Sequence, residues 1–327
     1  MSKPRAVEAG IAFVRTLHDA GFDDRAARLR ALVTDDATWW VDTGRDRAAG
    51  VRGHDPGDAR PWPLHGLMGF DAKLELVARV APGAFPDGVG ARVSTRAFGT
   101  DDVALVEAEG DGLHASGKRY RNRYAFVFDV SDDGITSVRE YLDTLHAEDV
   151  FGGDPPSRPT VAPPPEDREP LIPASRSEEL ALALWEPLAA QDVDAFGALF
   201  RPGATWWTDS GTDRDAGGFD VVEQPPPPGT WPLHGVVPMS AKLDAMRARL
   251  VEGYGGATLQ VTPVRIFGEG PLVALEADGY CALPNGRVYQ NRYCFVVEAY
   301  DDGIEQVREY ADTLHIVDAT GAVRPAA

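Results

Sequence analysis

The stretch VREYLDTLH at residues 138–146 returns as VREYADTLH at residues 307–315, with eight of nine letters kept. Four more motifs return with it: ATWW at 37–40 and 204–207, WPLHG at 62–66 and 231–235, AKL at 72–74 and 241–243, and YRNRYAFVF at 120–128, answered by YQNRYCFVV at 289–297. From WPLHG onward the offset is constant at 169 residues. Solenoid repeats have periods of about 20–50 residues, so this chain is instead a duplicated domain.

A proline-rich segment separates the two copies. Residues 151–176 hold eight prolines, and proline at that density gives an extended, semi-rigid spacer. The length of 327 residues also fits two domains of ordinary size. We therefore expect one domain at residues 5–150, a linker at 151–176, a second domain at 177–318, and a short disordered tail at 319–327.

Composition and charge exclude several classes of protein. The hydrophobic share of 43% and the charged share of 25% are typical of a soluble globular protein. No segment approaches the roughly 18 apolar residues that a membrane span needs. A net charge of −19 argues against nucleic acid and anionic membranes as partners. The first 20 residues fit an amphipathic helix and no signal peptide, so we expect a cytoplasmic protein. Only four of the 32 basic residues are lysines, a bias typical of GC-rich bacterial genomes.

The sequence offers no pattern for a metal or a cofactor. Motifs of zinc proteases, serine hydrolases, nucleotide triphosphatases and dinucleotide-binding proteins are absent. The two cysteines flank an LPNGR turn, and pairing across it sets Cys281 opposite Tyr289 and Cys294 opposite Glu276. The thiols are then not opposite each other, so a disulfide is not expected. We expect chemistry without a metal ion and without a cofactor.

The expected elements have the same order in both copies. Helical spacing of apolar residues predicts helices at 6–18, 24–33 and 67–80, with counterparts at 177–190, 192–200 and 236–251. A short strand is expected at ATWW, and turn residues delimit four further strands at 89–98, 102–110, 118–130 and 134–145. Helices first and a meander last predict an α+β domain, in which about three helices pack on one face of a curved antiparallel sheet.

Several of these motifs together carry a resemblance to a known superfamily. The stretch DDATWWVDTG, with Y-x-N-x-Y-x-F-V-F, D-G-I and V-R-E-Y-x-D, resembles the SnoaL-like branch of the nuclear-transport-factor-2-like superfamily, which includes ketosteroid isomerases, limonene epoxide hydrolases and polyketide cyclases. The resemblance covers both copies. It implies two tandem cone-shaped domains, each a curved sheet around a deep apolar pocket. It also implies an internal pseudo-dimer, in a chain that is a monomer or pairs with a second copy, and a small-molecule ligand in one or both pockets.

The resemblance directs attention to two carboxylates in each copy. In the epoxide hydrolases the first carboxylate of a similar last strand lies in the pocket, and this position matches Glu140 and Glu309. The water-binding position of their first strand, and the base of the isomerases, match Asp42 and Asp209. The Arg-x-Asp that completes the hydrolase triad is missing near residues 108–110, which argues against epoxide hydrolysis.

Such carboxylates have two interpretations. A carboxyl group in an apolar pocket has a raised pKa and can exchange protons near neutral pH, so Glu140 and Asp42 would divide general acid and base work. Alternatively, Glu140 pairs with Arg121 or Arg123 of the neighbouring strand, and Asp42 caps a turn.

Histidines and aromatic residues provide further candidates. His65 and His234 end a loop of about 20 residues, which suggests a lid with Trp62 and Trp231 on its underside; alternatively, these histidines cap the next helix. We interpret His146 and His315, at the end of the last strand, as structural. Adjacent tryptophans point to opposite faces of a strand, and we expect Trp40 and Trp207 to line the pockets.

Polar groups of one long strand complete the candidate set. Tyr120, Asn122 and Tyr124 share one face, as do Tyr289, Asn291 and Tyr293, and their side chains can donate hydrogen bonds to a substrate carbonyl. The alternative is a buried network that fixes the sheet. Leu142 shares the face of Glu140 and would form an apolar wall.

These residues predict a cofactor-independent acid–base enzyme: an isomerase, cyclase or dehydratase. Its substrate would be a small apolar or polycyclic carbonyl compound, in bacterial secondary metabolism. Two alternatives stay open: a non-catalytic small-molecule-binding or assembly protein, and a hydrolase of a small electrophile.

Overall fold

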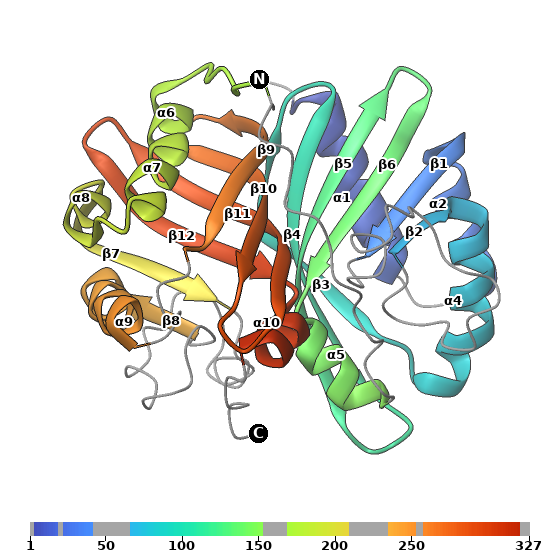
Figure 1. Cartoon of the computed structure of the whole chain (residues 1–327). Helices are drawn as coiled ribbons and strands as arrows, with labels where there is room; N and C mark the ends of the chain where they lie inside the picture. The colour runs from blue at the N-terminus through green and yellow to red at the C-terminus, as the bar shows by residue number, and fades with distance from the viewer. Residues whose placement is uncertain are drawn as a thin grey trace. The chain divides into compact units, whose positions relative to one another are not determined.

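The computed structural model describes residues 3–18, 22–41, 66–152, 169–208, 235–252 and 258–320 (Figure 1). The chain divides into two compact units, residues 1–159 and residues 160–327, here called unit 1 and unit 2. The division falls inside the proline-rich segment that the sequence predicts as a linker. The described residues contain no helix long and apolar enough to cross a membrane.

Unit 1 is a six-stranded sheet with helices. Its described elements are α1 (Arg5–His18), α2 (Phe22–Arg30), β1 (Val33–Val41), β2 (Gly66–Gly69), α4 (Phe70–Ala84), β3 (Gly90–Gly99), β4 (Val103–Leu113), β5 (Arg119–Ser131), β6 (Gly134–Leu142) and α5 (Thr144–Phe151). The strand order is β2-β1-β6-β5-β4-β3. Strands β3 to β6 form the expected antiparallel meander, but β1 runs parallel to β6. The sheet is therefore mixed: the last strand of the meander, β6, lies beside β1 and runs in the same direction.

Unit 2 repeats this topology, which confirms the duplication. Its described elements are α6 (Arg176–Ala183), α7 (Trp185–Ala189), α8 (Val193–Gly197), β7 (Phe200–Thr208), β8 (Gly235–Pro238), α9 (Met239–Glu252), β9 (Gln260–Glu269), β10 (Leu272–Ala282), β11 (Val288–Tyr300), β12 (Gly303–Ala311) and α10 (Thr313–Thr320). The order is β8-β7-β12-β11-β10-β9, with β7 parallel to β12. The predicted cross-turn pairs, Cys281 with Tyr289 and Cys294 with Glu276, are confirmed, and both cysteines are free.

The repeated motif VREYLDTLH at residues 138–146 changes from strand to helix in its middle. Strand β6 ends at Leu142, and the carboxylate of Asp143 caps α5 by accepting a hydrogen bond from the backbone N–H of His146 at 3.1 Å. Asp312 caps α10 in the same way through His315. The prediction of a strand through residue 145 is therefore wrong at its end, because an aspartate followed by helix-compatible residues favours a helix N-cap.

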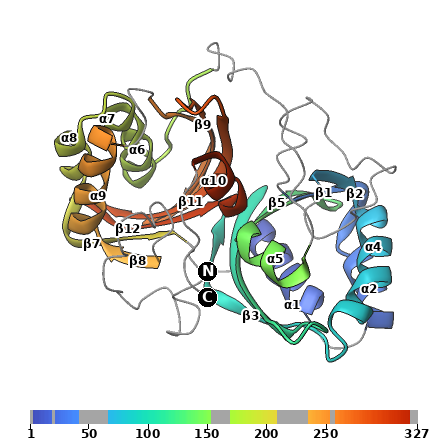
Figure 2. The same cartoon turned by 60° about the horizontal axis from the view of Figure 1, so that its bottom comes forward.

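Figure 2 shows the helices of each unit on the concave side of its sheet. In unit 1, Phe13 of α1 packs edge-on against Trp39 and Phe128, with ring centroids 5.2 and 5.3 Å away. A Cβ on Gly10 would lie 2.8 Å from the Phe128 ring, so glycine is what lets α1 approach the sheet this closely. Phe126, on the same face as Phe128, is paired with Glu140. The glutamate of the repeated motif therefore points to the helix-covered side.

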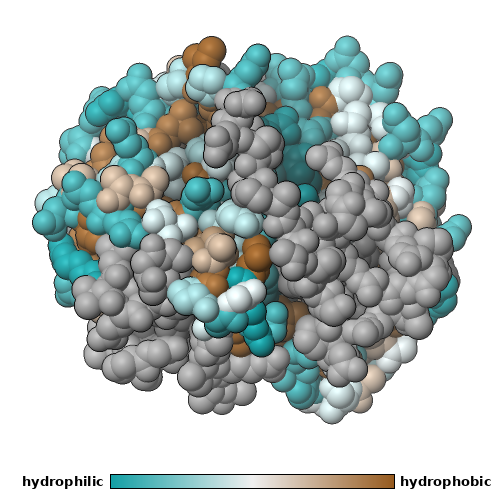
Figure 3. All heavy atoms as spheres, viewed as in Figure 1, coloured by the Kyte–Doolittle hydropathy of each residue, from teal (hydrophilic) through white to brown (hydrophobic). Residues whose placement is uncertain are grey.

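Large apolar side chains that remain exposed are few in the part of the chain that the structure describes. They are Leu113, Ile172, Val264 and Tyr300. The face drawn in Figure 3 is largely hydrophilic, with a group of hydrophobic residues over the region of unit 2 that holds α6, α7 and β9. Scattered exposed residues of this kind are normal for a globular protein.

Candidate functional site

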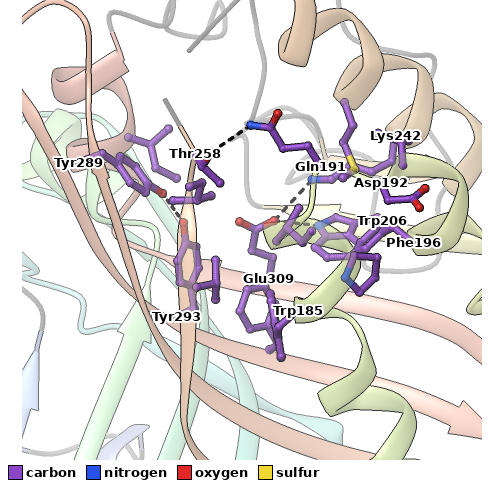
Figure 4. Close-up of a pocket in the computed structure, with 18 of the residues that line it drawn as sticks. Trp185, Gln191, Asp192, Phe196, Trp206, Lys242, Thr258, Tyr289, Tyr293 and Glu309 are labelled. Carbon is purple, nitrogen blue, oxygen red and sulfur yellow. Dashed lines mark hydrogen bonds and ion pairs between the residues drawn. The ribbon is translucent and has the colours of Figure 1, made fainter. Parts of the chain in front are cut away.

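Unit 2 contains a partly open cavity of about 120 Å³ between its helices and the concave face of its sheet (Figure 4). Aromatic and aliphatic side chains form most of the wall: Trp185, Pro187, Leu188, Val193, Phe196, Trp206, Met246, Leu259, Val261, Phe295 and Ile316. The polar lining residues are Gln191, Asp192, Lys242, Thr258, Tyr289, Tyr293, Glu309 and Thr320. One water needs only about 10–15 Å³, so this space accepts a small organic molecule.

Glu309 lines this cavity and is only 8% exposed. Its Oε2 accepts hydrogen bonds from Trp206 Nε1 at 2.8 Å and from Thr208 Oγ1 at 2.9 Å. The parallel register of β7 and β12 pairs Thr208 with Glu309, which explains this contact. Among the described residues no hydrogen-bond donor reaches Oε1. One oxygen is therefore held in place while the other remains available.

Lys242 is the cation beside this carboxylate. Its Nζ lies 3.6 Å from Oε2 of Glu309 and 4.4 Å from the centroid of the Trp206 ring. The side chain is 5% exposed, and burial lowers the pKa of its amine to about 8, although the charge of Glu309 acts in the opposite direction. The site thus holds a carboxylate and an easily deprotonated amine in apolar surroundings.

Unit 1 repeats the arrangement, but its glutamate accepts a hydrogen bond from a tryptophan and not from a threonine as well. Oε2 of Glu140 accepts a hydrogen bond from Trp39 Nε1 at 2.8 Å, and Lys73 Nζ lies 4.9 Å from the Trp39 ring centroid. Val41 takes the position of Thr208 and is paired with Glu140. Burial raises the pKa of Glu140, opposed by the charge of Lys73 and the hydrogen bond from Trp39. Burial also lowers the pKa of Lys73 to about 8.

The two lysines were missed by the sequence reasoning, although a signal was present. Lysine is rare in this chain, with four copies, yet two of them stand at equivalent positions inside the repeated AKL motif. A rare residue type that both copies keep at the same position of a helix indicates that this side chain has a specific role.

The alternative interpretation of Glu140 as an ion-pair partner of an arginine is wrong. Arg121 Nε lies 3.6 Å from Asp111 Oδ2, and Arg123 Nε lies 3.8 Å from Glu109 Oε1. Strand alternation places both arginines on the face of β5 opposite to Phe126, which is paired with Glu140.

The prediction that Trp40 and Trp207 line the pockets is also wrong. Trp40 packs against Tyr141 at 5.3 Å and Trp207 against Tyr310 at 5.0 Å between ring centroids. Adjacent strand residues point to opposite faces. The preceding tryptophans, Trp39 and Trp206, therefore lie beside the glutamates, and Trp206 lines the cavity.

The tyrosines and the asparagine of the long strand have different roles. Tyr289 and Tyr293 line the cavity, and their hydroxyl groups are hydrogen-bonded to each other. Asn291 is fully buried and is not among the lining residues. Its amide donates to the Tyr289 hydroxyl and to the carbonyl of Asp312, both at 3.2 Å, and accepts from the Asp312 N–H at 3.0 Å. The asparagine thus holds the junction of β12 and α10, as the alternative of a structural network predicted.

Unit 1 shows the same network around its own tyrosines. The hydroxyl groups of Tyr120 and Tyr124 are 2.7 Å apart, and Asn122 donates to Tyr120 at 3.2 Å and to the Asp143 carbonyl at 3.0 Å. Leu142 is paired with Tyr124 and belongs to the apolar core of this unit.

The structural interpretation of His146 and His315 holds, but both lie on helices. Nε2 of His146 accepts from the N–H of Arg121 at 3.0 Å, and Nε2 of His315 accepts from the N–H of Gln290 at 2.7 Å. Burial lowers the pKa of His146 to about 4, so its ring is a neutral acceptor at pH 7.

Six predicted site residues lie outside the described part of the chain. They are Asp42, His65, Trp62, Asp209, His234 and Trp231, and their roles stay predictions. Within the described ranges, no group of three His, Cys, Asp or Glu side chains is placed to hold a metal ion.

Comparison with known proteins gives a result at the level of the fold. No protein-family model and no curated protein matches the sequence. Solved structures similar to this chain include proteins named as nuclear-transport-factor-2-like. One such protein of unknown function, from Burkholderia pseudomallei, is 14% identical, covers 45% of this chain and 99% of its own, and has a TM-score of 0.35.

Two further neighbours have names that mention activities. A protein from Jannaschia sp. CCS1, named as a SnoaL-like polyketide cyclase, is 18% identical and covers 49% of this chain and 99% of its own, with a TM-score of 0.33. A protein from Catenulispora acidiphila with a ketosteroid isomerase-like fold, in complex with trimethylamine, is 10% identical, with coverages of 46% and 97% and a TM-score of 0.34. Each of these three structures spans about half of this chain.

Proposed function

We propose that unit 2 is a cofactor-independent acid–base enzyme for a small, mostly apolar carbonyl compound, within the isomerase, cyclase and dehydratase classes. One observation supports this most directly. Oε2 of Glu309 is fixed by Trp206 and Thr208, while Oε1 has no donor among the described residues, and Glu309 lines a mostly apolar cavity. A carboxylate held in this way is oriented for proton transfer rather than for cross-linking the fold.

In the proposed reaction, Glu309 removes a proton from the carbon next to the substrate carbonyl. Negative charge then develops on the carbonyl oxygen, and a donor in the low-dielectric cavity stabilises it. The tyrosine pair supplies such a donor. The Tyr289 hydroxyl accepts from Asn291 and shares a hydrogen bond with the Tyr293 hydroxyl. In the proposed reaction Tyr289 donates to Tyr293, and the Tyr293 proton is then available to the ligand. The ammonium of Lys242 adds a positive charge beside the base.

The test uses exchange of carbon-bound hydrogen for deuterium, which needs no knowledge of the natural substrate. 2-Tetralone, a bicyclic ketone, is incubated with the full chain in D₂O and followed by NMR. We expect the wild-type chain to accelerate exchange at the carbons next to the carbonyl. Glu309→Gln should reduce the acceleration by about 10²–10⁴-fold, since its amide still accepts from Trp206 and Thr208 but cannot act as a base.

Glu140→Gln is the matched control, because it makes the same change at the equivalent position of unit 1. A ketone that binds in the cavity, as shown by NMR line broadening, yet exchanges at the buffer rate would overturn the enzymatic proposal. That outcome would identify unit 2 as a binding module, the alternative that an apolar cavity also supports.

A further inference from the structure

The geometry points to Lys242 as an amine nucleophile that forms an imine with the carbonyl carbon of an aldehyde or ketone bound in the unit 2 cavity. This inference rests on the proposed function only in assuming a carbonyl ligand. Proton transfer by Glu309 would stand without it.

The position of the amine is the first argument. Lys242 lines the cavity from α9, one helical turn before Met246, which lines it as well. Its Nζ lies over the Trp206 ring at 4.4 Å. A ligand in the cavity therefore contacts the amine directly, in mostly apolar surroundings.

Four titratable groups line the cavity beside the Lys242 amine in the described part of the chain. The titratable groups that line the cavity with it are Glu309, Asp192, Tyr289 and Tyr293. Glu309 Oε2 is 3.6 Å away, whereas the Asp192 carboxylate accepts from the backbone N–H of Ala195 and caps α8. On α9 itself, Asp244 pairs with Arg247. Glu309 therefore brings a carboxylate within 4 Å of Nζ.

The protonation state of the amine supports the argument. Burial lowers the pKa of Lys242 to about 8. At pH 8 about half of such amines are neutral, against less than about 1% of an ordinary lysine with a pKa near 10.4. Desolvation in an apolar pocket is one of the established ways to make a lysine nucleophilic.

Glu309 accepts one proton and later returns it during imine formation. The ammonium of Lys242 gives a proton to Glu309, and the neutral amine forms a C–N bond to the carbonyl carbon, whose oxygen takes up the second amine proton. Glu309 returns its proton to the resulting hydroxyl group, the C–O bond breaks, and water leaves. One ammonium and one carbonyl become one protonated imine and one water, so the net charge beside Glu309 is unchanged.

The imine would also make Glu309 a more effective base. The carbon next to the imine carbon is two bonds from Nζ, and the carboxylate lies 3.6 Å from Nζ in the unliganded site. A protonated imine withdraws electrons more strongly than a carbonyl group, so removal of a proton from that carbon becomes easier. A lysine and a glutamate placed together in an apolar cavity serve this two-step chemistry.

The lysine content of the chain makes the proposal easy to test. The chain has four lysines. Lys3 and Lys118 are exposed, Lys73 is the buried counterpart in unit 1, and Lys242 lies at the cavity. The full chain is treated at pH 8 with 2-naphthaldehyde and sodium cyanoborohydride, which reduces an imine to a stable secondary amine. Peptide mass spectrometry then reports the rate at each lysine.

We expect Lys242 to be labelled at least about tenfold faster than Lys118, with a rate that rises with pH around 8, and 2-tetralone to slow the labelling of Lys242 alone. Labelling of Lys242 no faster than that of Lys118 would overturn the proposal. Lys242→Met should remove the fast label; where this variant does not fold, the comparison among the four lysines of the wild-type chain still decides.

The two proposals fail separately. Accelerated deuterium exchange without fast labelling of Lys242 refutes the imine and leaves proton transfer intact. Fast labelling without accelerated exchange does the reverse. The absence of both would refute both.

Discussion

At the scale of single residues, the surroundings of Glu140 and Glu309 differ by one hydroxyl group. Thr208 donates to Glu309 at 2.9 Å, whereas the equivalent residue beside Glu140 is Val41. Burial raises the pKa of Glu140, and a hydrogen bond to the charged form lowers a carboxyl pKa. Val41→Thr, a change of equal size, should therefore lower the pKa of Glu140, as measured by NMR titration of ¹³C-labelled glutamate. An unchanged titration curve would show that a hydroxyl group at this position does not lower the pKa of Glu140.

A second residue-scale prediction concerns His146, whose pKa falls from an ordinary 6.5 to about 4 on folding. Between these pH values the unfolded chain binds a proton at His146 that the folded chain does not bind. The contribution of neutral His146 to the free energy of unfolding is therefore fully present above pH 6.5 and is lost as the pH falls toward 4. His146→Gln keeps an acceptor for the Arg121 N–H but cannot titrate. Denaturation at a series of pH values should show that the wild type loses up to about 3 kcal/mol more than the variant across this window. Parallel curves would contradict the assignment.

At the scale of elements, cross-strand packing positions the tyrosines that line the cavity. A Cβ on Gly279 of β10 would lie 2.6 Å from Cε2 of Tyr293, and one on Gly110 of β4 would lie 3.1 Å from Cε2 of Tyr124. Gly279→Ala should therefore displace the Tyr293 ring, cost about 1–3 kcal/mol of stability and weaken 2-tetralone binding. Gly110→Ala, the same change in unit 1, should be milder and leave binding in unit 2 unchanged. Equal effects of the two variants on binding would refute this account.

The sequence predicts the strands and their local pairing, but not the pairing of strands that lie far apart in the chain. The meander strands and the pairing of Cys281 with Tyr289 follow from local turn signals, and both are confirmed. The parallel pairing of β1 with β6 is not local, since 101 residues separate Trp39 from Glu140, and no periodicity encodes it. The face of the last strand was ambiguous for the same reason. The buried lysines were missed because amphipathic spacing treats a lysine as solvent-facing.

At the scale of the whole molecule, the duplication supplies two versions of one site with different interiors. In unit 1, Phe151 of α5 packs on Tyr120 and Phe85, with ring centroids 5.3 and 5.5 Å away. The position 169 residues later is Thr320, which lines the unit 2 cavity. A ring is thus replaced by a small side chain at the wall where the ligand is proposed to bind. The arrangement of the units as an internal pseudo-dimer stays a prediction.

This difference predicts that ligand binding depends on Thr320. Thr320→Phe places a ring beside Tyr289, as Phe151 lies beside Tyr120, and should abolish 2-tetralone binding and accelerated exchange while the chain remains folded. If the site proposed in unit 2 is the one that works, calorimetry of the wild-type chain should give one ligand per chain, and Glu140→Gln should leave exchange nearly unchanged. Phe151→Thr is the reciprocal variant: opening the wall of unit 1 beside Glu140 and Lys73 should raise the stoichiometry toward two. If Thr320→Phe binds as well as the wild type, the ligand does not occupy this cavity, and the division of work between the units is wrong.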